Sequence, residues 1–328
     1  MELHWRWLIA IYLFFGGLGA GAYLTSYAAE KGYLGEASSL TKAGYYVSAP
    51  LVGIGAGLLI FDLGQGLHKP WLIIGMFFNF TSVMTWGIYI LSAFIGVGLL
   101  RAFFAWKEWK APAILSNAGA ILALSTCAYT GLLLAVLKAV PFWNFYLMPV
   151  IFVVSALSTG VSLTCILSHF LEKGELKEGK SSLAHLLMVG LELILLFIFF
   201  EVILSGSKGP AAEASANMIV YGSLAPYFWV ILIGCGLIIP FFFYVYNILK
   251  MRSAKRVAKR VKTFDMGLED MLVPAVALSE EAATHQNTNH GGSSLAILIC
   301  DGAVLLGGFA LRCIIVFSAV PVWNGRVG

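Results

Sequence analysis

Eight long apolar stretches constrain the fold of this chain more than any other feature of its sequence. They lie at about residues 7–29, 43–63, 72–99, 114–138, 147–171, 182–204, 219–249 and 295–320. A helix needs roughly 20 apolar residues to cross the ~30 Å hydrocarbon core of a bilayer. Strands of a membrane barrel would instead alternate in polarity over ~10 residues, a pattern that the sequence lacks. We therefore predict an all-α integral membrane protein, a bundle of about eight transmembrane helices.

The composition agrees with a membrane protein and not with a water-soluble one. Of the 328 residues, 59% are hydrophobic and 12% are charged, against roughly 45–50% and about 25% in soluble domains. We predict one transmembrane domain over residues 1–328, with a cytoplasmic loop at about 250–294. The first stretch is too long for the apolar part of a signal peptide, so we expect a retained helix.

A glycine-rich segment in the first stretch resembles a dinucleotide-binding fingerprint only superficially. Residues 16–21 read GGLGAG. The fingerprint has meaning where a strand precedes it and a helix follows, whereas this segment lies inside an apolar helix. Small residues in membrane helices allow close approach of a neighbouring helix. The segment therefore predicts tight helix packing.

The distribution of basic residues predicts how the bundle is oriented. Fifteen of the 21 Lys and Arg residues fall in the connections after the first, third, fifth and seventh stretches. Cytoplasmic connections carry the excess of positive charge, so we expect both termini on the periplasmic side of a bacterial or archaeal inner membrane. The basic run at 250–262 is typical of a segment that meets anionic lipid headgroups, and we expect no nucleic acid partner.

The sequence lacks the usual ligand patterns of bound redox centres. Its five cysteines stand singly in apolar stretches, with no C-x-x-C pair, which argues against iron–sulfur clusters and structural zinc. A membrane haem would need paired histidines on facing helices, and only His169 and His185 come near that pattern. We favour an interfacial place for both histidines. We predict no haem, no iron–sulfur cluster and no metal in this chain.

Ionisable residues inside the apolar stretches are the first functional candidates, because charge in a membrane is costly. They are Asp62, Glu192, Glu201, Asp301 and Arg312. In the predicted orientation Asp62, Glu201 and Arg312 lie toward the outer face, Glu192 near mid-depth and Asp301 in the inner half. The structural alternative is that Asp62 or Glu201 only pairs with Arg312 to hold the bundle together.

Aromatic and histidine side chains are expected near the same outer face. They are Tyr12, His68, Trp86 and Tyr129. For the two tyrosines the alternative is a packing role or a place in the interfacial aromatic belt. A pocket with an apolar body, stacking aromatics, phenols and nearby carboxylates suits a quinone headgroup. The quinone carbonyls need hydrogen-bond donors, and two protons accompany two electrons, so acid/base groups must lie within reach.

A series of short motifs occurs in one order along nearly the whole chain. Residues 7–21 read WLIAIYLFFGGLGAG, 60–64 IFDLG, 81–87 TSVMTWG, 129–134 YTGLLL, 141–144 PFWN, 149–160 PVIFVVSALSTG and 307–312 GGFALR. In this order the chain resembles the NrfD/PsrC family, membrane subunits of respiratory, polysulfide reductase-like oxidoreductases. Two positions depart from the family pattern: Gln65 replaces the arginine of D-L-G-R-P, and Tyr12 stands where some relatives have histidine.

The resemblance implies partners and a substrate. Family members are eight-helix bundles without cofactors of their own, and they bind a quinone (menaquinone or ubiquinone) near the outer face. Electrons pass to or from a ferredoxin-like iron–sulfur subunit, which usually relays to a molybdenum enzyme or a multihaem cytochrome. By resemblance Tyr129 belongs to the quinone pocket, Asp62 matches the acid of D-L-G, and Arg312 matches a late arginine of the family.

The sequence therefore predicts a quinone-exchanging membrane anchor. Asp62 and Tyr129 would bind or protonate the headgroup, with Tyr12, His68, Trp86 and Arg312 around them. A proton path from the cytoplasm would use Glu192, Glu201 and Asp301. The alternatives are an ion or solute transporter, for which we find no clear inverted repeat or broken helix, and a purely structural anchor.

Overall fold

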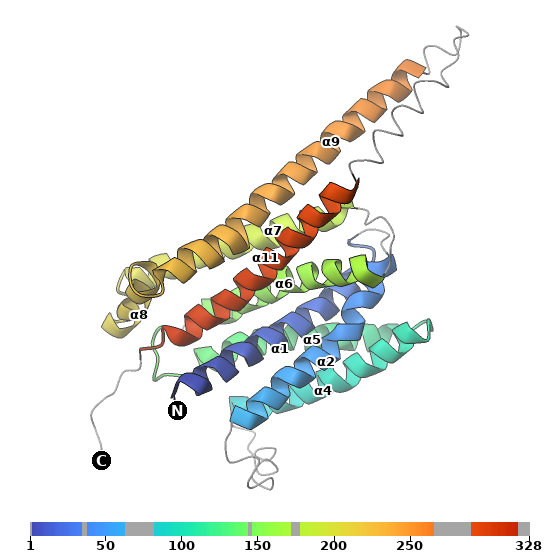
Figure 1. The fold of residues 1–328 in the computed structure, drawn as a ribbon. Coiled ribbons are helices and arrows are strands. Elements are labelled where there is room, and N and C mark those ends of the chain that lie inside the picture. Colours follow the sequence, from blue (N-terminus) through green and yellow to red (C-terminus); the bar gives the residue numbers. More distant parts are fainter. Residues whose placement is uncertain are drawn as a thin grey trace, which may run out of the picture.

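The computed structural model describes residues 2–34, 38–62, 82–143, 146–171, 178–265 and 290–320, and all regular structure in these residues is helical (Figure 1). Eight helices are long and apolar enough to cross a membrane. The predicted all-α bundle of eight spanning helices is thus confirmed. His68 lies outside the described residues, and so does the side chain of Asp62.

The spanning helices follow one another along the chain. They are α1 (Glu2–Glu30), α2 (Ser38–Asp62), α4 (Val83–Trp106), α5 (Ala113–Ala135), α6 (Leu147–Leu171), α7 (Glu178–Leu204), the continuous pair η1 (Tyr227–Ile238) and α9 (Ile239–Asp265), and α11 (His290–Phe317). A short helix, α8 (Pro210–Val220), lies between α7 and η1. Gly209 precedes it with φ 88°, and Pro210 suits the first helical turn, where no backbone N–H is needed.

Two helices run several residues beyond the C-terminal ends of the predicted stretches. Helix α4 ends at Trp106, so Arg101 lies inside its last turns and not in the connection that follows. Helix α9 continues to Asp265, so the first part of the predicted loop at 250–294 is helical. A stretch identified by hydropathy ends at its first charged residues. A helix, in contrast, ends only where its backbone leaves helical geometry, and it can continue through charged residues because Lys, Arg and Ala are good helix formers.

The seventh crossing begins as a π-helix, which the sequence analysis did not predict. Residues 227–238 form η1, and the turn at 221–224 interrupts the stretch predicted at 219–249. Gly236 of η1 faces Gly307 of α11, and a Cβ at either glycine would lie 2.6 Å from the Cα of the other. The absence of both side chains therefore lets these two backbones touch.

The bundle has two chemically different ends. Trp7 contacts Phe317, with ring centroids 4.8 Å apart, so α1 begins where α11 ends. We call this the terminal end. At the opposite end, the basic end, α1 finishes and exposed Lys107 and Lys110 follow α4. Helix α9 extends beyond its neighbours on this side (Figure 1), and its Arg252 is exposed there.

The helices form two groups that meet at α1 and α6. Helices α1, α2, α4 and α5 pack around one another, and α6, α7, α9 and α11 form the other group. Backbones of α1 and α6 touch at Gly21 and Gly160, where an added Cβ on Gly21 would overlap the carbonyl of Ala156. The close packing predicted for the glycine-rich segment is therefore present.

Candidate functional site

Tyr129 lies in the half of the bundle near the terminal end, six residues before the end of α5. Its buried ring packs directly against Gly87 in the first turns of α4, where a Cβ would overlap the ring. The neighbouring Trp86 is exposed on the outside of α4. A glycine at position 87 is thus the reason the phenol can lie flush with the start of this helix.

Tyr12 of α1 is the second phenol in this half of the molecule. Its side chain is fully buried, close enough to Tyr129 for electrostatic interaction. Its hydroxyl has no hydrogen-bond partner among the described residues. A buried polar group without a partner costs about 1–3 kcal/mol, so this hydroxyl is suited to a water molecule or a ligand oxygen.

Arg312 of α11 is fully buried between three helices. Its Nη1 donates to Ser155 Oγ of α6 at 2.9 Å and to the Gly308 carbonyl at 2.6 Å, while its Nε approaches the Leu13 carbonyl of α1 at 3.4 Å. The guanidinium also lies over the rings of Phe14 and Phe152. The Nη2 atom has no hydrogen-bond partner among the described residues.

Glu192, and not Glu201, is the acid of α7 that faces this arginine. Glu192 is buried beside Ser155 and Ser158 of α6, within electrostatic range of Arg312. Glu201 is exposed on α7, which corrects its predicted place on an interior proton path and argues against the alternative in which it pairs with Arg312. Nine residues separate the two acids. At 3.6 residues per turn this spacing puts them on opposite faces of the helix.

A second buried polar cluster lies toward the basic end, around Asp301 of α11. Tyr244 Oη of α9 donates to Asp301 Oδ1 at 2.5 Å, and His185 Nε2 of α7 lies 3.1 Å from the same oxygen. The rings of His185 and Tyr244 stack with centroids 4.6 Å apart. All three side chains are buried.

Cys165 of α6 completes this cluster. Donor atoms of Cys165, His185 and Asp301 lie within 4.8 Å of one another. Sulfur, imidazole and carboxylate donors can hold a transition metal, but the hydrogen bond from Tyr244 and the close approach of His185 already give Asp301 polar neighbours without an ion. That the chain holds no metal stays a prediction.

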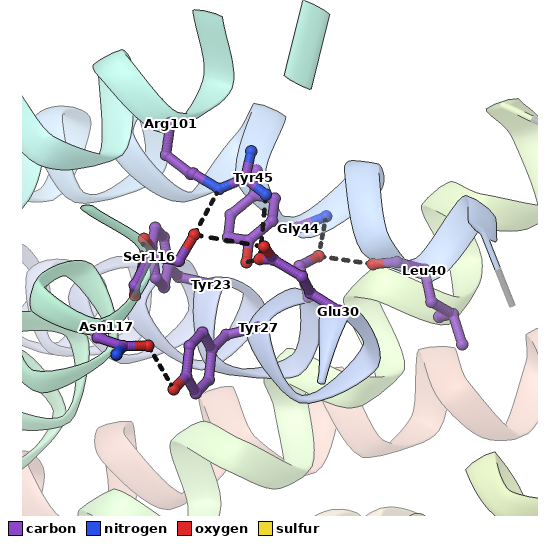
Figure 2. Close-up of polar contacts among 10 residues, drawn as sticks. Tyr23, Tyr27, Glu30, Leu40, Gly44, Tyr45, Arg101, Ser116 and Asn117 are labelled. Carbon is purple, nitrogen blue, oxygen red and sulfur yellow. Dashed lines mark hydrogen bonds and ion pairs between the residues drawn. The ribbon is translucent and has the colours of Figure 1, made fainter. Parts of the chain in front are cut away.

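A third polar cluster, absent from the sequence analysis, ties four helices together at the basic end (Figure 2). Arg101 of α4 donates to Glu30 of α1 at 3.0 Å and to Ser116 of α5 at 3.1 Å. Tyr45 of α2 donates to Glu30 at 2.5 Å, and Arg101 lies 4.0 Å from the centre of its ring. We call these four residues the Glu30 cluster.

Signals for the Glu30 cluster existed in the sequence but were weak. Glu30 is the last residue of α1, and Arg101 stands beyond the end of the predicted third stretch, so both read as connection residues. Nearby, Lys42 donates to Glu108 at 2.6 Å, and this bond lowers the pKa of the exposed Glu108 below its ordinary value. The available clue to the cluster was that acidic and basic residues stand at the ends of apolar stretches that lie on the same side of the membrane.

Comparison with known proteins gives consistent matches. Residues 1–258 match the family described as polysulphide reductase, NrfD. The sequence is 33% identical to a polysulfide reductase chain of Wolinella succinogenes over 72% of its own length and 81% of that protein. It is 27% identical to protein NrfD of Escherichia coli K12 over 73% and 83%. It is 26% identical to a selenate reductase subunit of Mesobacillus selenatarsenatis over 72% and 65%.

Proposed function

This chain belongs to the NrfD family of polysulphide reductase-like membrane proteins, and from that membership we propose that it is the quinone-binding subunit of a respiratory oxidoreductase complex. Two relatives are named as parts of larger reductases, one of a polysulfide reductase and the other of a selenate reductase. A multi-pass membrane anchor follows for this chain from its eight candidate spanning helices.

The pairing of Tyr129 with Gly87, beside the buried hydroxyl of Tyr12, is the observation that supports a quinone site best. The two phenols come from α5 and α1 and lie in the same half of the bundle. A quinone headgroup is a flat ring with two carbonyl oxygens, so it binds among aromatic rings that also offer O–H donors. In the proposed site Tyr129 and Asp62 donate to the headgroup or exchange protons with it, with His68 and Trp86 nearby.

Arg312 contributes to the proposed site by its charge. It lies one helix away from Tyr12, because its Nε approaches the carbonyl of Leu13. A fixed positive charge stabilises the negative charge that develops on a quinone oxygen when electrons arrive before protons. The three-helix cradle of Arg312 holds that charge in place while the headgroup exchanges.

The proposed electron partner docks at the terminal end of the bundle. Quinone chemistry in this chain would need an external electron relay, for which we propose a ferredoxin-like iron–sulfur subunit. That subunit would relay to a further redox subunit, a molybdenum enzyme or a multihaem cytochrome. In the orientation predicted from charge the terminal end faces the periplasm, and the quinone is menaquinone or ubiquinone.

The test is the rate at which quinol reduces the iron–sulfur clusters of the intact complex in membranes. Tyr129→Phe and Asp62→Asn should each lower this rate at least about tenfold, since one hydrogen-bond donor or proton-exchanging group is lost. Tyr27→Phe is the matched control, because it removes a phenol bonded to Asn117 on the exposed surface and should leave the rate unchanged. Wild-type rates in both site variants would overturn the assignment of the pocket.

A further inference from the structure

Several buried polar atoms have no hydrogen-bond partner among the described residues, and five of them follow one route through the bundle. They are Tyr12 Oη, Arg312 Nη2, Ser158 Oγ, Ser162 Oγ and Asp301 Oδ2. Native proteins satisfy the large majority of buried polar groups, with ordered water where no protein partner is present. Five such atoms along one route therefore indicate internal water.

A line of polar side chains on α6, which we call the seam, connects the part of this route near the terminal end with the part near the basic end. It consists of Ser155, Ser158, Ser162 and Cys165, and all four side chains are buried. Spacings of three and four residues place side chains on one face of a helix. With a rise of ~1.5 Å per residue the seam is about 15 Å long.

Contacts at the two ends of the seam anchor it to the buried charges. At one end, Ser155 accepts a hydrogen bond from Arg312, and Glu192 lies beside Ser155 and Ser158. At the other end, Cys165 lies against His185 and Asp301. The seam therefore joins the acid at mid-depth to the acid nearer the basic end.

The two central serines behave differently from the other hydroxyls of the same helix. Thr159, Thr164 and Ser168 each donate to a carbonyl of α6 itself at 2.7–2.8 Å. Ser158 and Ser162 are buried and make no such bond. Hydroxyls of membrane helices normally bond to the preceding turn, so these two are available to bind water, and Ser158 lies next to the Glu192 carboxylate as well.

The Glu30 cluster provides the contrast. It lies at the basic end in the other group of helices, and its Glu30, Arg101, Tyr45 and Ser116 side chains hydrogen-bond to one another. Because its polar groups hydrogen-bond to one another, this cluster needs no water molecules and links its helices directly. The seam is therefore the better route for protons between the basic end and the proposed pocket.

We propose that a line of internal water molecules along the α6 seam conducts protons between the basic end and the pocket of Tyr12 and Tyr129. A proton is taken from the aqueous phase at the Asp301, His185 and Tyr244 cluster, passes over waters held by Ser162 and Ser158, and reaches Glu192. From Glu192 it continues past Arg312 toward Tyr12.

The line deepens the proposed function and rests on it for the destination of the proton. When a quinone takes up two electrons from the partner subunit, two protons arrive on its two carbonyl oxygens. When a quinol is oxidised, the same two protons leave its hydroxyl groups and travel in the opposite direction. No group of the line is oxidised or reduced.

Direct observation of water tests the line without reference to quinone. In a cryo-EM map of the intact complex at about 2 Å resolution, ordered water should lie within hydrogen-bond distance of Ser158 Oγ and Ser162 Oγ. Metal analysis of the same preparation should find no ion bound in the Asp301 cluster. Dry packing around both serines, or a stoichiometric metal ion at Asp301, would contradict the proposal.

Proton uptake in proteoliposomes tests conduction. During quinone turnover by the reconstituted complex, Ser162→Leu should fill the seam and lower proton uptake from the basic side at least about tenfold, and Asp301→Asn should do the same, because each breaks one link of the relay. Ser162→Thr keeps the hydroxyl, and Thr164→Val removes one that bonds only to α6. Both should stay within about twofold of wild type, the change expected where no link is lost.

The outcomes separate this line from the quinone pocket. Wild-type uptake in both Ser162→Leu and Asp301→Asn would overturn the line, and Asp301→Asn preserves size, so it decides the matter if Ser162→Leu does not fold. If Tyr129→Phe and Asp62→Asn both leave quinone turnover intact while Asp301→Asn still lowers uptake, the pocket assignment fails and the line stands.

Discussion

At the scale of single residues, Gly87 sets how closely Tyr129 approaches α4. A Cβ at this position would overlap the Tyr129 ring, so Gly87→Ala must displace the phenol. We expect a KM for quinol raised about tenfold or more, because small misplacements of positioned groups can cost up to 10²-fold. Gly96→Ala is the control on the same helix, since a Cβ there meets nothing within 4 Å. Equal KM values in the two variants would show that the proposed pocket does not include this ring.

The buried pair of Arg312 and Glu192 makes a prediction about stability. Removing one charge leaves the other uncompensated in the interior, which costs about 3–5 kcal/mol. Arg312→Met should therefore lower the free energy of unfolding by that amount. The double variant with Glu192→Gln should lose less than the sum of the single changes. Chemical denaturation in detergent measures both.

The matched control for Arg312 is Lys138→Met, which changes an exposed cation and should shift stability by no more than about 0.5 kcal/mol. Additive losses in Arg312→Met and Glu192→Gln would mean that the two side chains, on α11 and α7, do not interact. The electrostatic interaction that we assign to this buried pair would then be wrong.

The sequence predicted the environment of a single residue only where it also indicated which face of its helix points into the bundle. It identified Glu192, Asp301 and Arg312 as buried ionisable groups, and all three are buried in the structure. It put Glu201 on the same proton path as Glu192, although a spacing of nine residues turns them to opposite faces. Tyr244 and Ser162 went unnoticed because a tyrosine and a serine in an apolar stretch are ordinary until their neighbours across the bundle are known.

At the scale of helices, the Glu30 cluster holds the basic end of α1, α2, α4 and α5 together. Arg101 is buried and Glu30 is partly buried, with a side-chain exposure of 29%. Arg101→Met and Glu30→Gln should each destabilise the protein. Their coupling energy in a double-mutant cycle should fall at about 0.5–3 kcal/mol, as measured by thermal or chemical unfolding.

The control for that cycle is the pair of Lys42 and Glu108, also at the basic end and also joined by a short bond. Because this pair is exposed, water and salt screen it, and Lys42→Met with Glu108→Gln should show a smaller coupling that fades as salt is added. A larger coupling in the exposed pair than in the Glu30 cluster would contradict the role we give to Arg101.

Helix number and order were predictable, whereas helix ends were not. Each crossing needs about 20 apolar residues, so eight stretches indicate eight crossings. Helix α4 runs past Arg101, and only the three-dimensional structure reveals Glu30 beside that residue. The π-helical start of the seventh crossing is equally absent from the hydropathy pattern, and so is the contact between Gly236 and Gly307 in this segment.

At the scale of the whole molecule, the two helix groups divide the polar interior between them. The first group closes its basic end with the self-satisfied Glu30 cluster. In the second group Ser158 Oγ, Ser162 Oγ and Asp301 Oδ2 have no hydrogen-bond partner within the described part of the chain. Tyr12 and Arg312 lie on α1 and α11, which pack against each other, so the proposed pocket lies where the two groups meet. In this proposal protons reach the pocket along the seam from the basic end, whereas the quinone enters the pocket from another side.

The orientation of the bundle in the membrane is the remaining prediction at this scale. Exposed Lys110 lies at the basic end, whereas exposed Lys138 and Ser205 follow α5 and α7 at the terminal end. In a Cys235→Ser background we expect a membrane-impermeant maleimide to label Lys138→Cys and Ser205→Cys from the periplasm. Lys110→Cys should react only after the membrane is permeabilised, since positive charge marks the cytoplasmic side.

The reverse labelling pattern would place the pocket of Tyr12 and Tyr129 on the cytoplasmic side, together with any iron–sulfur partner docked at the terminal end. Two labelling positions at the terminal end are needed because a docked subunit could cover one of them.

The orientation also decides whether proton movement along the seam transfers charge across the membrane. With the basic end in the cytoplasm, protons drawn in along α6 for quinone reduction leave the cytoplasm, while the partner's electrons come from the periplasm. Charge would then cross the membrane with each turnover, whereas a pocket open only to the periplasm would move none.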